Sequence, residues 1–217
     1  IPGCELISVE KMQSTQAMRA IAEHSDKAYT LLYTKRTALK IGMFALERMV
    51  QVMEMTHAGM AYADHYQQMD GVQKPAPVID YQPGSLRDDF NFGSVLLFNA
   101  NAFKEVIENT EEEYQYAGLY DLRLKISQKR KLVHINEYLY TEVESDKRKS
   151  GEKQFDYVDP KNRQVQIEME QACTNHLKEI GGYLYPIFRP VDFSSHTFEY
   201  EASVIIPVRN RIRTVKD

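Results

Sequence analysis

The alternation of strand-type and helix-type segments over the first third of the chain constrains the fold most. Apolar, β-rich segments occupy residues 4–10, 29–33 and 59–66. Between them, residues 14–25 and 44–56 carry apolar side chains at helical spacing. The order β, α, β, α, β favours a mostly parallel sheet with helices on both faces. We therefore predict an α/β fold.

The rest of the chain continues with the same element types. Periodicity and capping signals predict, in order, a strand, two helices, a strand and a long C-terminal helix at 94–98, 100–108, 116–127, 132–142 and 160–181. Glycine and prolines in residues 67–82 indicate an irregular surface excursion, and the charged residues 145–159 indicate an exposed loop. An aromatic, proline-interrupted arm follows the long helix.

Composition and charge exclude several classes of protein. The 217 residues are 43% hydrophobic and 27% charged, which is typical of a globular protein with one core. A net charge of -4 leaves no basic footprint for nucleic acid, which we do not expect as a partner. No apolar run approaches the roughly 18 residues of a membrane span. We expect a cytoplasmic protein, with peripheral association at the inner face of the membrane as an alternative.

The stretch from Gly84 to Phe98 is the first candidate site. A polar turn with Arg87, Asp88 and Asp89 runs directly into the apolar strand. Ligand sites are common where loops carry polar groups at the ends of core strands, so we predict that these three residues bind substrate. Adjacent acidic residues in a turn also occur in solvated loops, and that alternative stays open.

Several motifs resemble one enzyme family. Residues 203–210 read SVIIPVRN, which is similar to the opening strand of family-2 glycosyltransferases. Four earlier stretches resemble later motifs of that family in matching order, and they read AYADHY at 61–66, SVLLFNANAF at 94–103, YDLRL at 120–124 and EYLY at 137–140.

The resemblance implies a domain organisation and a function. It implies a GT-A-like (Rossmann-like) domain at 1–182, a linker arm at 183–201, and the first strand and helix start of a second, truncated glycosyltransferase domain at 202–217. The implied activity is hexosyl transfer from a nucleotide-sugar to a glycan acceptor in polysaccharide assembly. The alternative is a non-catalytic GT-A-like module that binds glycan or positions the catalytic domain that follows in the same polypeptide.

The same resemblance locates candidate site residues. The family's metal-binding D-x-D aligns with Tyr33-Thr34-Lys35, and lysine cannot ligate the Mg²⁺ or Mn²⁺ that accompanies a nucleotide-sugar. We therefore expect no metal ligand there, and Lys35 becomes a substrate-binding cation in place of the metal. The general-base position falls on Gly118-Leu119, which leaves Asp121 as the catalytic candidate. Asp64 and His65 are further candidates for substrate binding.

Overall fold

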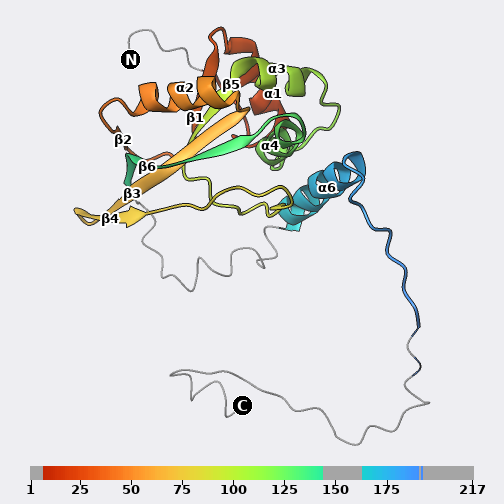
Figure 1. Cartoon of the computed structure of the whole chain (residues 1–217). Helices are drawn as coiled ribbons and strands as arrows, with labels where there is room; N and C mark the ends of the chain where they lie inside the picture. Colours follow the sequence, from red (N-terminus) through yellow and green to blue (C-terminus); the bar gives the residue numbers. More distant parts are fainter. Residues whose placement is uncertain (1–6, 144–162, 191, 193–217) are drawn as a thin grey trace, which may run out of the picture. The chain divides into compact units, whose positions relative to one another are not determined.

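A mixed sheet lies at the centre of the first of two units, residues 1–183 and 184–217. The computed structural model describes residues 7–143, 163–190 and 192 (Figure 1). The described strands follow the order β1 (Tyr29–Tyr33), β5 (Val95–Asn99), β3 (Met60–Met69), β6 (Leu132–Val143) and β2 (Leu39–Ile41), and β4 (Val72–Ala76) pairs with β3. The described helices are α1 (Thr15–His24), α2 (Ala45–Thr56), α3 (Ala100–Glu108), α4 (Gly118–Lys129) and α6 (Arg163–Glu179).

The α/β class is confirmed, but the prediction of a mostly parallel sheet is wrong. Among the described strands, only β3 and β6 pair in parallel, and every other pairing is antiparallel. Strand β5 lies between β1 and β3 and runs opposite to both. Parallel neighbours need a crossover, usually helical, and the chain between β3 and β5 contains no helix. It reverses direction through β4 and an irregular segment instead.

Most predicted elements form within a few residues of their expected bounds, with three differences. The described part of the first predicted strand, residues 7–10, is not a strand. Strands β2 and β4 were not predicted, although Asp70-Gly71 between β3 and β4 is a hairpin signal and both residues have positive φ angles, 50° and 81°. The predicted loop at 145–159 and the second domain at 202–217 lie outside the described residues.

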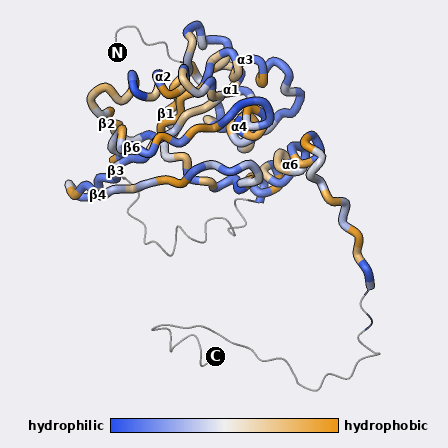
Figure 2. The backbone as a smooth tube through the Cα atoms, in the orientation of Figure 1, coloured by the Kyte–Doolittle hydropathy of each residue, from blue (hydrophilic) through white to orange (hydrophobic). Residues whose placement is uncertain are grey.

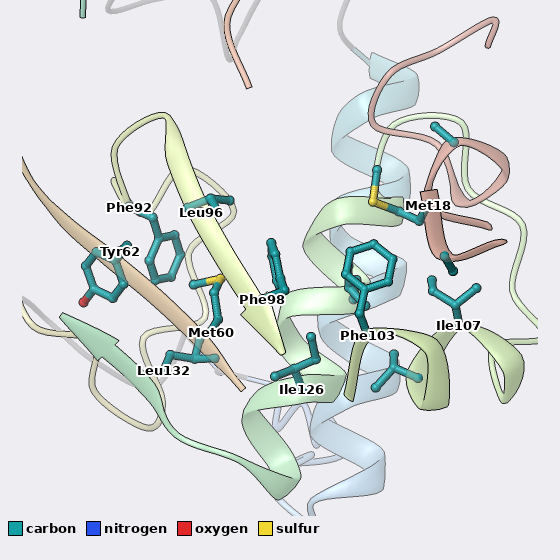
Figure 3. Close-up of a cluster of buried hydrophobic side chains, with 14 of the residues drawn as sticks. Met18, Met60, Tyr62, Phe92, Leu96, Phe98, Phe103, Ile107, Ile126 and Leu132 are labelled. Atoms are coloured by element: carbon teal, nitrogen blue, oxygen red, sulfur yellow. The ribbon is translucent and has the colours of Figure 1, made fainter. Parts of the chain in front are cut away.

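Two apolar layers enclose the sheet because its strands alternate. On β3, Met60 and Tyr62 pack with α1, α3 and α4, whereas Ala61 and Ala63 pack with α2 on the opposite face. Figure 3 shows the larger layer, where Phe98 of β5 meets Phe103 of α3 edge to face at 5.4 Å. The hydropathy view shows the same concentration of apolar residues along the central strands (Figure 2).

Helix α4 is buried on two sides, which explains its weakly amphipathic sequence. Leu122 and Ile126 join the layer against the sheet. Tyr120 and Leu124 pack instead with Ala172 of α6. Helix α6 is therefore part of the first unit, although residues 144–162 before it are not described. No described helix is long and apolar enough to cross a membrane.

Two methionines of α2 provide a matched test of the layer between α2 and the sheet. Met49 is 1% exposed and Met55 is 79% exposed. We expect Met49→Ala to lower the free energy of unfolding by about 2–5 kcal/mol, because it removes buried apolar surface and leaves a cavity. Met55→Ala makes the same change on the same helix and should stay within about 0.5 kcal/mol of wild type. Urea unfolding followed by circular dichroism measures both; equal losses would contradict the packing described.

Candidate functional site

Two adjoining hollows lie where α4 begins. Their volumes are about 360 and 590 Å³. They share four lining residues, namely Gln13, Thr34, Tyr116 and Leu119. The first hollow continues under the loop that leads into β5, and the second continues along the end of β1 and the segment before α1. Each volume falls in the range of small-molecule sites.

The shared wall is rigid because the starts of α1 and α4 are joined. The amide of Thr15 donates to the carbonyl of Tyr114 at 2.8 Å, and the amide of Leu119 donates to the carbonyl of Gln13 at 3.2 Å. At Gly118, a Cβ atom would stand 2.3 Å from the nitrogen of Thr15, so this approach requires glycine. The fold therefore has no room for a carboxylate side chain at position 118.

Helix α6 provides hydrogen-bond acceptors for the start of α4. One carboxylate oxygen of the buried Glu168 accepts hydrogen bonds from the amides of Tyr116 and Ala117, at 2.7 and 3.3 Å. This side chain does the work of an N-cap from a distant segment, since Ala117 itself offers no capping side chain. The position of Tyr116 on the wall of both hollows thus depends on α6.

Helix α4 also holds the loop that carries the acidic turn. The hydroxyl of Tyr120 donates to the carbonyl of Leu86. The guanidinium of Arg123 donates to the carbonyls of Arg87 and Ser85, at 3.0 and 3.4 Å. These bonds tie the backbone of residues 85–87 to the helix, and the loop then continues along the wall of the first hollow.

Asp88 and Asp89 both line the first hollow. Asp89 is already engaged, because Arg87 donates to its two oxygens at 2.8 and 2.7 Å. This pair is exposed, and exposed pairs stabilise by about 0–1 kcal/mol. Among the described residues, Asp88 forms no hydrogen bond and no direct ion pair, although Arg87 and Arg123 attract it from farther away. Its carboxylate oxygens can therefore accept hydrogen bonds from a ligand in the first hollow.

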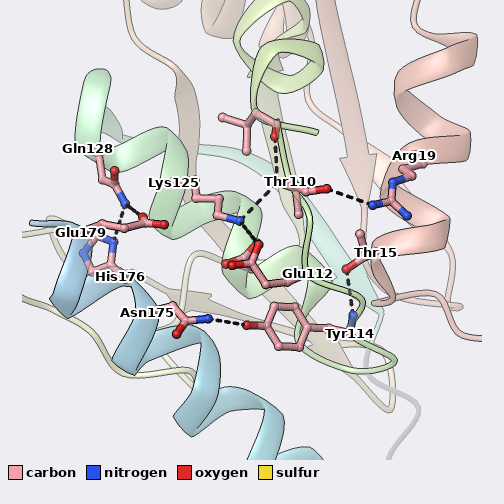
Figure 4. Close-up of polar contacts among 12 residues, drawn as sticks. Thr15, Arg19, Thr110, Glu112, Tyr114, Lys125, Gln128, Asn175, His176 and Glu179 are labelled. Atoms are coloured by element: carbon pink, nitrogen blue, oxygen red, sulfur yellow. Dashed lines mark hydrogen bonds and ion pairs between the residues drawn. The ribbon is translucent and has the colours of Figure 1, made fainter. Parts of the chain in front are cut away.

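Asp121 lies outside both hollows. It is buried, and its carboxylate forms an ion pair with Lys125 at 2.9 Å. Lys125 also pairs with Glu112 at 2.8 Å (Figure 4). Burial raises the pKa of Asp121, and the hydrogen bond from Lys125 opposes that rise. Residues two apart on a helix point about 200° apart, so Leu119 on the hollow wall and Asp121 face opposite ways.

Lys35 lines the second hollow but is already paired. It forms an ion pair with Glu142, whose side chain is 2% exposed. The other oxygen of Glu142 stands 3.5 Å from Nε2 of His65, which is buried and stacks on Tyr140. The charge of Lys35 therefore offsets a buried carboxylate, and His65 lies behind the wall rather than on it.

Asp64 has a structural role in the sheet. It stands at an irregularity in the β3–β6 register, and its Oδ1 accepts from the amide of Val78 at 2.8 Å. The same oxygen is 2.9 Å from Nε2 of His134, whose Nδ1 is 2.7 Å from Asp80. These contacts hold the segment after β4 against the sheet.

The structure thus brings Lys35, Asp88 and Asp89 to the hollows and leaves the other predicted residues elsewhere, namely Asp64, His65, Arg87 and Asp121. The position aligned with D-x-D does not fit a divalent ion, since it carries two hydroxyls and a paired lysine. In the described part of the chain, no group of three or more His, Cys, Asp or Glu side chains is placed to hold a metal.

Sequence reasoning missed Arg123 and Tyr116, which both line the first hollow. A signal for Arg123 was present. It lies between Leu122 and Leu124 in YDLRL, and a charged side chain flanked by apolar residues of a buried helix needs a specific environment. Tyr116 carries no comparable signal, because its place depends on Glu168.

No protein-family model matches this sequence, and no curated protein matches it either. The function must therefore be argued from the geometry of the hollows and from the motifs described above.

The Lys35–Glu142 pair can be tested by removing the lysine. We expect Lys35→Met to cost at least about 2 kcal/mol of unfolding free energy, less than the 3–5 of a fully buried pair, because Lys35 is partly exposed. The double variant Lys35→Met/Glu142→Gln should recover most of that loss. Lys40→Met, at an exposed lysine, is the control. Urea unfolding distinguishes these outcomes, and a single variant as stable as wild type would contradict the expected energetic role of this pair.

Burial lowers the pKa of His65 from its ordinary value of 6.5, although Glu142 opposes this effect. The unfolded chain then binds the proton more readily than the folded protein. Stability contributed by neutral His65 should therefore be present above pH 6.5 and be lost as the pH falls below it. In a pH titration followed by NMR, the midpoint of the His65 imidazole shifts should be lower in the folded protein than in urea. A higher midpoint in the folded protein would contradict this prediction.

Proposed function

We propose that the first unit is a glycosyltransferase-related, GT-A-like module that binds a nucleotide-sugar or glycan and leaves sugar transfer to another domain. One observation carries this proposal. Leu119 occupies the wall of both hollows at the position where the resemblance puts the general base, and Asp121 faces away. Transfer with inversion needs a carboxylate to accept the proton of the acceptor hydroxyl, and leucine cannot do so.

The first hollow suits a sugar ring. Aromatic side chains provide flat apolar surfaces, and amide, hydroxyl and carboxylate groups beside them can bond sugar hydroxyls. The aromatic members are Phe90, Phe92, Phe98, Tyr116 and Tyr120, and the polar ones include Gln13, Asn91 and Asp88.

The second hollow suits phosphates better than sugars. Lys11, Lys35 and Arg36 line it. Because Lys35 is paired with Glu142, the charge available to a diphosphate comes from Arg36 and from Lys11, whose ammonium lies 5.2 Å from the ring centre of Tyr116. A nucleotide in the second hollow and a sugar in the first would meet at Tyr116.

A second candidate function is transfer by this unit itself. It is favoured by Asp88, which lines the first hollow and has no partner among the described side chains. An unpaired carboxylate next to a bound acceptor hydroxyl would serve as the base. This hypothesis requires that turnover disappear in Asp88→Asn.

Calorimetric titration of the chain with UDP, GDP and UDP-glucose, with and without Mn²⁺, tests the proposal. We expect metal-independent binding, no sugar transfer to water or glycan, and at least about tenfold weaker binding in Tyr116→Ala, the loss expected for one central aromatic contact. Tyr138→Ala, at a half-exposed tyrosine outside both hollows, is the control. Absence of any nucleotide or glycan binding would overturn the proposal, and turnover that requires Asp88 would replace it with the second candidate.

A further inference from the structure

Arg123 is a buried cation without a carboxylate partner. It is 4% exposed and forms no ion pair within 4.0 Å with a described residue, although the carboxylate of Asp88 attracts it from farther away. Burial lowers the pKa of its guanidinium below the ordinary value. A buried charge is costly unless it is paired, so this position calls for an explanation.

The surroundings of Arg123 leave part of it free. Its guanidinium lies 4.8, 5.3 and 5.8 Å from the ring centres of Tyr120, Phe92 and Tyr81. The rings offset part of the cost through cation–π attraction. Its two hydrogen bonds to carbonyls and its interaction with Tyr81 leave at least one of the five N–H groups of the guanidinium unused. The side chain also lines the first hollow, where a ligand can reach it.

Support of the loop at 85–87 does not by itself account for this arginine. Its partners there are backbone carbonyls, which also accept from a neutral donor such as glutamine, although a charged donor forms the stronger bond. A neutral side chain would hold the loop without the desolvation cost of a charge. Within the protein this charge meets aromatic rings and, beyond ion-pair distance, the carboxylate of Asp88. An oxyanion that enters the hollow could therefore still form the direct ion pair that the protein does not provide.

We infer that the first hollow takes a sugar unit that bears an oxyanion, a carboxylate or a phosphate, and that Arg123 pairs with that oxyanion. This inference rests on the proposed function and specifies its ligand. Arginine recognises both groups through two parallel N–H bonds. Of the two acids on the wall, Asp89 is neutralised by Arg87, and Asp88 remains to accept hydrogen bonds from the sugar hydroxyls.

The test compares sugars of the same ring that differ in charge. The full chain is titrated with glucose, glucuronate and glucose 6-phosphate, with NMR shifts as the readout. We expect at least one anion to bind about tenfold or more tightly than glucose, as one charged hydrogen-bonded pair would provide. Comparison of glucuronate with glucose 6-phosphate shows whether the hollow prefers a carboxylate or a phosphate.

Variants assign the preference to Arg123. In Arg123→Gln the advantage of the anion over glucose should disappear, and Arg123→Lys should keep part of it. Arg48→Gln is the matched control, because it makes the same charge change at an exposed arginine paired with Glu137, outside both hollows. If Arg123→Gln does not fold, the comparison of sugars in the wild type and in Arg123→Lys still shows whether Arg123 is responsible for the preference for anions.

The outcomes separate this inference from the proposed function. Equal affinity for the neutral and the anionic sugars in the wild type, or an advantage that survives in Arg123→Gln, would overturn the inference. If UDP or glucose binds in that case, the proposed function stands without it. If neither UDP nor any of the sugars binds, the proposed function fails and the inference fails with it.

Discussion

The burial of α4 on two sides is the constraint on which the rest of the structure depends. One side of the helix closes the layer against the sheet, and the other packs on α6. Its first turn is held by Glu168 of α6 and by the close approach of Gly118 to α1. The same helix holds the acidic loop through Tyr120 and Arg123. Helix α4 therefore contributes both to the core packing and to the candidate site.

Charge pairing separates the structural ionic groups from those available to a ligand. Lys35 pairs with Glu142, and Asp121 pairs with Lys125, so each of these charges has a counterion within the fold. Arg123 and Asp88 form no ion pair within 4.0 Å among the described residues, although they attract each other from farther away, and both line the first hollow. A binding role fits these two groups, because neither is held in a direct ion pair.

Much of the fold could be predicted from the sequence. The bounds of β1 and α3 follow from local periodicity, and Ser14 caps α1 as its sequence suggests. The direction of β5 could not be predicted in this way, because its apolar sequence suits a parallel and an antiparallel strand equally. Only the path of the chain from β3 to β5 sets that direction. Of the candidate site, Asp88 and Asp89 were anticipated from the turn before β5, whereas Arg123 and Tyr116 were missed.

The sequence by itself determined the described helices and the strands β1, β3, β5 and β6, since their patterns depend on side chains a few residues apart, but it did not determine β2 and β4. Only the tertiary structure decided which ionic groups are already paired. Lys35 and Glu142 are more than a hundred residues apart in sequence, and their pairing requires strands β1 and β6 in one sheet. The availability of a charge depends on its neighbours in space, and these are set by packing across the whole unit.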